Sequence, residues 1–118
     1  MTSHDGSRRV RVLADYQCHP LWLSGYPDGY VGDIAPEDEL LNLSPELVRG
    51  LTAWAAEFDA ILCWEDPGSS DFPSPEAEQA FAEKGEALAR QVARELGPEW
   101  SVKYHDLRLG ADRSIPAS

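Results

Sequence analysis

The sequence predicts an α+β fold: a two-layer sandwich in which two helices pack on a small, mainly antiparallel sheet. The helices are indicated by the tripeptide Ser-Pro-Glu, which occurs at residues 44–46 and again at 74–76. The terminal strands are indicated by alternating apolar and polar residues at about 8–16 and 100–106. With 118 residues the chain is long enough to bury one core, so we expect a single domain over residues 1–118.

The helices are expected at about 45–62 and 75–96. The serine before each helix can accept a hydrogen bond from the first turn, and the proline after it needs no donor. The glutamate that follows favours the positive end of the helix dipole. Gly97-Pro98 is a stop signal for the second helix. The apolar stripe of the first helix consists of Leu47, Leu51, Trp54, Phe58 and Ile61.

The apolar stripe of the second helix contains a glycine. Its other members are Ala77, Phe81, Leu88, Val92 and Leu96. Gly85 lies in the same stripe, although a glycine inside a helix costs about 1 kcal/mol relative to alanine. We therefore expect a bulky side chain, Trp54 or Phe58, to pack closely against Gly85.

The remaining segments are expected to form a hairpin and two tails. Residues 21–34 predict a short hairpin around the turn signal at 26–29, and an ordered loop pinned by Trp22 and Tyr30 is the alternative. If every connection reverses the chain, the first and last strands run antiparallel. Residues 1–7 are polar and residues 108–118 show no periodicity, so both ends are expected to be flexible.

The negative charge is concentrated in the middle of the chain. The net charge is −11, and residues 28–83 contain fourteen acidic residues with Arg49 as their only base. Such a surface repels nucleic acid and anionic membranes. Acidic segments often serve only solubility, but they also attract a protein with a basic surface. We expect a partner of that kind, and neither nucleic acid nor a membrane.

The candidate partner-binding residues lie on either side of the first predicted helix. They combine acids with two large aromatic residues: Glu37, Asp38, Glu39, Trp64, Glu65, Asp66, Asp71 and Phe72. The alternative for Trp64 and Phe72 is that both fold back onto the core. A partner surface would make this chain a non-catalytic, acidic protein-binding domain.

Two other hypotheses compete with partner binding. One is a small enzyme or ligand-binding domain with a pocket between sheet and helices, lined by Tyr16, Cys18, Trp22 and Trp54. The other is a nucleic-acid mimic, in which spaced carboxylates copy phosphates. Salt separates them, because steered binding to a basic partner weakens as ionic strength rises and binding in an apolar pocket does not.

The sequence shows no motif for catalysis, for a metal or for a cofactor, and we expect none of them. Cys18 and Cys63 are not at metal-ligand spacing, and the glycines form no phosphate-binding pattern. If the terminal strands are antiparallel, Cys18 and His19 lie at the opposite end of the sheet from His105, which weakens any zinc site. Without an apolar leader or membrane-length stretch, the expected location is the cytoplasm.

Three motifs carry a resemblance to other proteins. They are Ala14-Asp15-Tyr16 with Cys18 and Pro20-Leu21-Trp22, then Leu43-Ser44-Pro45-Glu46-Leu47, and Phe72-Pro73-Ser74-Pro75-Glu76-Ala77-Glu78. With these motifs the chain resembles short, uncharacterised proteins of high-GC Gram-positive bacteria. Small acidic domains of this kind are similar to immunity or antitoxin proteins, which block a toxin by binding it. By analogy of size and charge, the resemblance implies an immunity-like binding domain.

Overall fold

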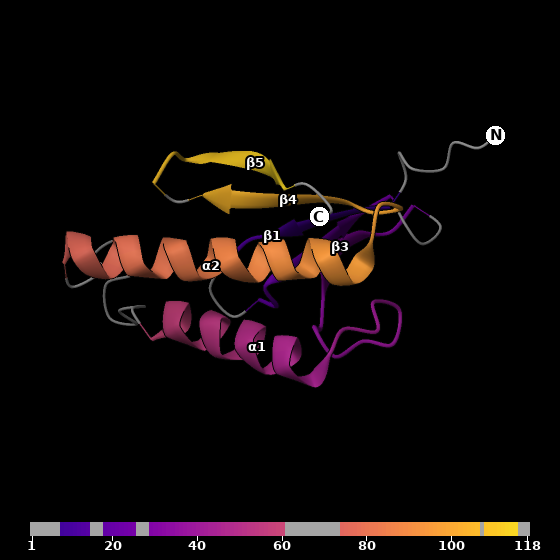
Figure 1. The fold of residues 1–118 in the computed structure, drawn as a ribbon, viewed down its shortest axis with the longest axis horizontal. Helices are drawn as coiled ribbons and strands as arrows, with labels where there is room; N and C mark the ends of the chain where they lie inside the picture. The colour runs from indigo at the N-terminus through magenta and orange to yellow at the C-terminus, as the bar shows by residue number, and fades with distance from the viewer. Residues whose placement is uncertain (1–7, 15–17, 26–28, 61–73, 107, 116–118) are drawn as a thin grey trace.

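The computed structural model describes residues 8–14, 18–25, 29–60, 74–106 and 108–115. Within them, one sheet has the order β3-β2-β1-β4-β5 and two helices lie on one side of it (Figure 1). The elements in chain order are β1 (Arg9–Val12), β2 (Leu21–Ser24), β3 (Val31–Ile34), α1 (Pro45–Asp59), α2 (Pro75–Leu96), β4 (Ser101–Asp106) and β5 (Ala111–Ile115). The predicted α+β class, with two helices on a mostly antiparallel sheet, is confirmed.

Both helices begin where the Ser-Pro-Glu tripeptides predict. The Oγ atom of Ser44 accepts a hydrogen bond from the backbone N–H of Leu47 at 3.2 Å. The Oγ atom of Ser74 accepts one from Ala77 at 3.1 Å. These bonds satisfy N–H groups that have no partner inside the helix. α2 ends at Leu96 as predicted, whereas the last predicted residues of the first helix, 61–62, lie outside the described residues.

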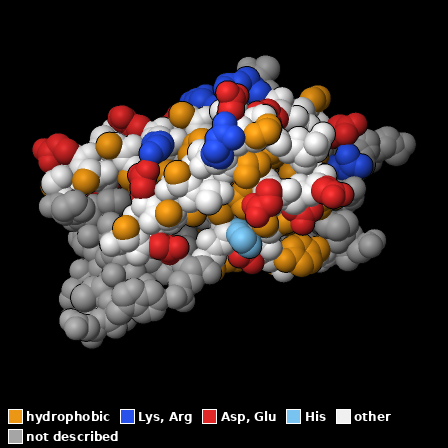
Figure 2. All heavy atoms as spheres, turned by 90° about the horizontal axis from the view of Figure 1, so that it is seen from below, with side chains coloured by type: hydrophobic (Ala, Val, Ile, Leu, Met, Phe, Trp, Pro, Cys, Tyr) orange, Lys and Arg blue, Asp and Glu red, His pale blue; other side chains and the backbone are white. Residues whose placement is uncertain are grey.

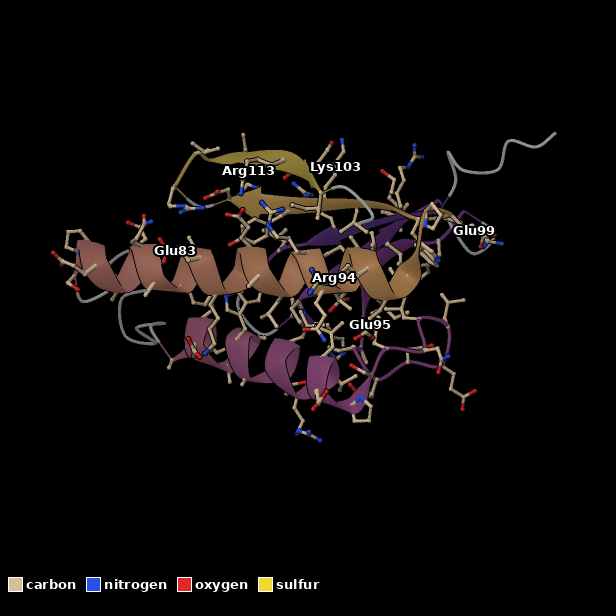
Figure 3. The ribbon with its side chains drawn as sticks, in the orientation of Figure 1. Glu83, Arg94, Glu95, Glu99, Lys103 and Arg113 are labelled. Atoms are coloured by element: carbon tan, nitrogen blue, oxygen red, sulfur yellow. The ribbon has the colours of Figure 1, made fainter. Side chains whose placement is uncertain are left out.

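The sequence pattern does not reveal that the end of α2 is linked to the start of α1. Glu95, near the end of α2, accepts hydrogen bonds from the backbone N–H and the hydroxyl of Ser44, both at 2.7 Å. Burial raises the pKa of Glu95, but the two bonds from Ser44 outweigh it, so the pKa lies below its usual range. Figure 3 shows Glu95 directed from α2 toward the start of α1. The ionised carboxylate therefore ties the end of α2 to the start of α1.

The core forms where both helices meet the sheet, and Gly85 lies at its centre. The indole of Trp54 stacks on Phe81 with ring centroids 4.8 Å apart. A Cβ atom on Gly85 would lie 2.8 Å from Cε2 of Trp54 and 2.5 Å from the hydroxyl of Tyr104. The predicted close packing of Trp54 against Gly85 is confirmed, and Tyr104 of β4 is a second neighbour that the helix stripes alone do not indicate.

The predicted hairpin at residues 21–34 is confirmed. β2 and β3 are antiparallel, with Leu21 opposite Ile34 and Leu23 opposite Gly32. β2 also pairs antiparallel with β1, so β1, β2 and β3 form a meander on one half of the sheet. The predicted first strand over 8–16 is shorter in the structure, where Leu13 and Ala14 follow β1 without strand pairing and 15–17 lie outside the described residues.

The terminal strands are parallel, so the expectation that they run antiparallel is wrong. β1 pairs with β4 in parallel register, with Val10 opposite Val102 and Val12 opposite Tyr104. Figure 1 shows reversals between α1 and α2 and between α2 and β4. The connection between β3 and α1 does not reverse the chain, so both elements point in the same direction. Residues 35–44, which can span roughly 30 Å, allow this because they reach from the end of β3 back to the start of α1.

The C-terminal residues form a strand, although the sequence predicts a flexible tail over 108–118. β5 pairs antiparallel with β4 over its whole length, from Ala111 opposite Asp106 to Ile115 opposite Val102. Gly110, at φ +65°, makes the tight turn between them. Ile115 is the only apolar side chain that β5 buries, so the strand lacks the hydrophobic alternation by which strands are usually predicted. Residues 116–118 lie outside the described residues.

Candidate functional site

The connector between β3 and α1 presents three consecutive exposed carboxylates, Glu37, Asp38 and Glu39. The backbone here is held in a turn, in which Asp38 donates to the carbonyl of Ala35 and accepts from the N–H of Leu41. The Asp38 carboxylate also accepts from the N–H of Leu40 at 2.9 Å. No base among the described residues forms an ion pair with these three acids. The turn fixes the backbone that carries Asp38, and no described base neutralises the three acids.

The surface beside these acids is hollowed. A hollow of about 630 Å³ lies between β2, β3 and the connector, and Tyr30, Asp33 and Asp38 contribute to its rim. Its apolar lining comes from Leu23, Ile34, Ala35 and Leu40. A second hollow of about 390 Å³ lies between the three connector acids and the first turns of α1, and Arg49 lines it too. Asp38 lines both hollows and joins them into one surface.

Two large apolar side chains are exposed next to the same acids. Tyr30 is 45% exposed and Val31 is 75% exposed. The hydroxyl of Tyr30 donates to the carbonyl of Asp33 at 2.8 Å, which fixes the ring across the edge strand β3. We call the set Tyr30, Val31, Asp33, Glu37, Asp38 and Glu39 the acidic β3 surface.

The acidic β3 surface has the composition of a protein-binding patch. Interfaces commonly combine aromatic anchors with a charged rim. Figure 2, which views the molecule from the side of α1, shows acidic and hydrophobic side chains close together on this face. Sequence reasoning singled out the three connector acids but left Val31 and Asp33 out. The glycine and aspartate inside the four-residue strand Val31–Ile34, which are typical of an edge strand, are the signal that would have added them.

The other predicted partner residues, Trp64, Glu65, Asp66, Asp71 and Phe72, lie outside the described residues. So does Tyr16 of the alternative pocket. The structure therefore places only Glu37, Asp38 and Glu39 of the predicted partner set.

The alternative pocket residues do not converge. Trp54 is 1% exposed in the core, where its Nε1 atom donates to the carbonyl of Phe81. Trp22 lies on the opposite face of the sheet, and its Nε1 atom donates to the carbonyl of Leu13 at 3.2 Å. Cys18 lines a third hollow, against the outer side of α1. None of the hollows found along the described residues is lined by both Trp22 and Trp54.

The parallel pairing of β1 with β4 also changes where the histidines lie. Because Val12 is opposite Tyr104, His19 and His105 are at the same end of the sheet, not at opposite ends as expected. They still have separate partners: the backbone N–H of His19 donates to Asp33, and the Nδ1 atom of His105 is 3.0 Å from Asp112. Among the described residues no three His, Cys, Asp or Glu side chains cluster as metal ligands.

A second charged group, which the sequence did not indicate, joins α2 to the β4–β5 hairpin. Asp106 is buried, and its carboxylate accepts three hydrogen bonds from Arg108, from the backbone N–H, Nε and Nη2. Arg113 of β5 reaches Glu86 of α2 at 2.7 Å, and Figure 3 shows it on the hairpin beside α2. We call Glu86, Asp106, Arg108 and Arg113 the Asp106 network. Its charges compensate each other, so its role is structural.

The bonds to arginine lower the pKa of both acids in the Asp106 network. For Asp106 the main cause is the hydrogen bonding to Arg108. For Glu86 the main cause is the hydrogen bond to Arg90, with Arg113 and Arg108 adding to it. Both carboxylates are held in the charged form that the arginines require.

A family model described as Serratia CdiI immunity protein-like matches residues 8–107. The matched range contains every described helix and strand except β5. No curated protein matches the chain. Across the described residues, no helix has both the length and the apolar character needed to cross a membrane.

Proposed function

The chain belongs to the Serratia CdiI immunity protein-like family, and on that premise we propose that it is an immunity protein that binds a toxin protein and blocks it. The match over residues 8–107 is the observation that carries this proposal. The scattered placement of Cys18, Trp22 and Trp54 gives no support to a pocket between sheet and helices. Binding without catalysis is the function that fits both the family match and the scattered placement of these residues.

We infer further that the toxin presents a basic surface to the acidic β3 surface. Three exposed carboxylates without a basic partner among the described residues attract cations, and Tyr30 and Val31 beside them supply apolar contact area. Charge complementarity of this kind speeds encounter and fixes orientation more than it adds affinity. The likeness to proteins of high-GC Gram-positive bacteria and the cytoplasmic location stay predictions.

A growth assay tests the immunity function. The immobilised chain captures binding proteins from a lysate of its source organism, and each captured protein is then expressed alone in a bacterial host. We expect at least one of them to arrest growth, and co-expression of this chain to restore it. If no captured protein is toxic, or if the chain does not relieve the arrest, the immunity function is wrong.

A charge-matched pair of variants tests the acidic β3 surface. One variant combines Glu37→Gln, Asp38→Asn and Glu39→Gln, in which the amide oxygen at position 38 still accepts the Leu40 bond. Its control combines Glu76→Gln, Glu78→Gln and Glu83→Gln on α2, so both variants lose three negative charges. We expect association with the purified toxin to slow roughly tenfold at low salt in the first variant only. Equal association rates for the two variants would assign steering to the total charge instead of this surface.

A further inference from the structure

The face of the sheet turned away from the helices carries a set of bases in a chain of net charge −11. In the strand register, Arg11 of β1 lies between Trp22 of β2 and Lys103 of β4. Arg9 is two residues before Arg11 in β1 and therefore lies on the same face. Their strand neighbours Val10, Val12, Leu23, Val102 and Tyr104 are buried on the helix side. We call Arg9, Arg11, Trp22 and Lys103 the basic sheet surface. Figure 3 shows Lys103 on the side of β4 away from α2.

Two of these bases have no carboxylate partner among the described residues. Arg11 is paired with Asp112, at 3.1 Å, and Asp112 also contacts His105. Within the described part of the chain, Arg9 contacts the carbonyl of Ser24 at 3.4 Å, and neither Arg9 nor Lys103 has an ion pair. A chain with this net charge gains no solubility from exposed bases, and acids that could neutralise them are plentiful. The surface therefore retains positive charge that the fold itself does not use.

The same surface offers a shaped apolar contact. A hollow of about 220 Å³ lies among Arg9, Arg11, Trp22 and Lys103. Ser24, Ser101 and Asp112 also line it, and Asp112 is the carboxylate paired with Arg11. The indole of Trp22 is held by its bond to the carbonyl of Leu13, so the ring is fixed before anything binds. A fixed aromatic ring loses little entropy on binding and serves well as an anchor.

We propose that the basic sheet surface binds an acidic peptide segment of a partner protein. Carboxylates of the segment pair with Arg9 and Lys103, and an apolar side chain of the segment fills the hollow against Trp22. Charge complementarity selects an acidic occupant, and the total charge of −11 disfavours a long polyanion such as nucleic acid, which would meet the repulsion of the whole molecule. Asp33 lies opposite Trp22 in the strand register, so this site borders the acidic β3 surface, but its bases come from β1 and β4 and the proposal does not depend on the toxin proposal.

The experiment is a peptide titration of the full chain in low salt, monitored by the amide and indole NMR signals of the protein. The probe is the synthetic peptide Ac-EELEEL-NH2, and its basic counterpart Ac-KKLKKL-NH2 is titrated in parallel. We expect the acidic peptide to shift the Trp22 indole signal and the amides of β1 and β4 in a saturable manner. The basic peptide should instead shift the amides of the connector acids Glu37, Asp38 and Glu39, which lie outside the sheet.

Single charge reversals identify the side chains. Arg9→Glu and Lys103→Glu should each weaken binding of the acidic peptide roughly tenfold, the usual scale for replacing a contact by a repulsion. Arg94→Glu, an exposed reversal of equal charge on α2, should change it less than about twofold. Trp22→Phe should weaken binding while leaving the salt dependence as in the wild type.

Four results would overturn the proposal. The first is that the acidic peptide produces no saturable shifts, and the second is that Arg94→Glu weakens its binding as much as Lys103→Glu does. A 20-nucleotide single-stranded DNA shifts the same signals at lower concentration, which would make the occupant a nucleic acid. Dilution of the chain without peptide shifts these signals, which would make the occupant a second copy of the chain.

Discussion

At the scale of single residues, Gly85 sets how closely the helices approach the sheet. The indole of Trp54 and the hydroxyl of Tyr104 both reach past it to donate to successive carbonyls of α2, those of Phe81 and Ala82. A side chain at 85 would occupy the space of both donors. We predict that Gly85→Ala destabilises the fold by roughly 1–3 kcal/mol, although alanine favours helices, and urea unfolding measures it.

Gly50 of α1 is the matched control for Gly85. A Cβ atom there would lie 2.9 Å from Cδ2 of Leu88, which is the end of a flexible side chain that can move. Gly50→Ala is therefore expected to leave stability unchanged or to raise it by up to about 1 kcal/mol. In a Tyr104→Phe background, Gly85→Ala should cost less, because the Tyr104 hydroxyl, one of the three atoms that a Cβ would crowd, is gone. A stabilising Gly85→Ala would show that Trp54 and Tyr104 do not pack against Gly85 as described.

At the scale of elements, β5 depends on strand pairing and charge more than on apolar burial. Ile115 is the one apolar residue that β5 buries, and the Asp106 network links the strand to α2. The pKa of Asp106 is lowered by its bonds to Arg108, so this contribution is present above the unfolded-state pKa near 4. It is lost as the pH falls below that value, because protonation then favours the unfolded chain.

We therefore predict that Asp106→Asn lowers the free energy of unfolding by roughly 3 kcal/mol at pH 7, since it leaves arginines without their buried acid. The difference from wild type should shrink as the pH falls from 5 toward 3. Glu99→Gln, which removes an exposed ion pair with Arg8, should cost less than about 1 kcal/mol at every pH. Urea titrations at several pH values measure this, and a pH-independent difference for Asp106→Asn would contradict the assignment.

The elements also show what local sequence determines. Both helix starts, the end of α2 and the hairpin at 21–34 follow from caps, prolines and turn residues, whose effects act over a few residues. β5 is held by pairing with β4 and by the link between Arg113 and Glu86, which are distant in sequence. The bond between Ser44 and Glu95 joins residues from two different helices. Local patterns cannot reveal such partners.

At the scale of the whole molecule, the direction of β4 and the separation of charge into two surfaces could not be read from the sequence. The parallel pairing of β1 and β4 depends on the path of residues 35–44 through space. The charge of residues 28–83 was evident, and it led to the connector acids. The basic sheet surface was hidden, because Arg9, Arg11 and Lys103 meet only when β1 lies beside β4.

A net charge of −11 on a small domain also predicts how stability depends on salt. At about 10 mM salt the Debye length is roughly 30 Å, comparable to the shorter dimensions of the molecule, 27 and 25 Å. Repulsion among the acids then acts across the whole fold, and at about 150 mM it is largely screened. We predict that the melting temperature rises by a few degrees between these salt concentrations. Glu37→Gln, Asp38→Asn and Glu39→Gln together should reduce that rise and increase stability at low salt, because no described base pairs with these acids. A melting temperature that falls with added salt would mean that ion pairs such as the Asp106 network outweigh the repulsion among the acids. The connector acids would then stabilise the fold and not destabilise it.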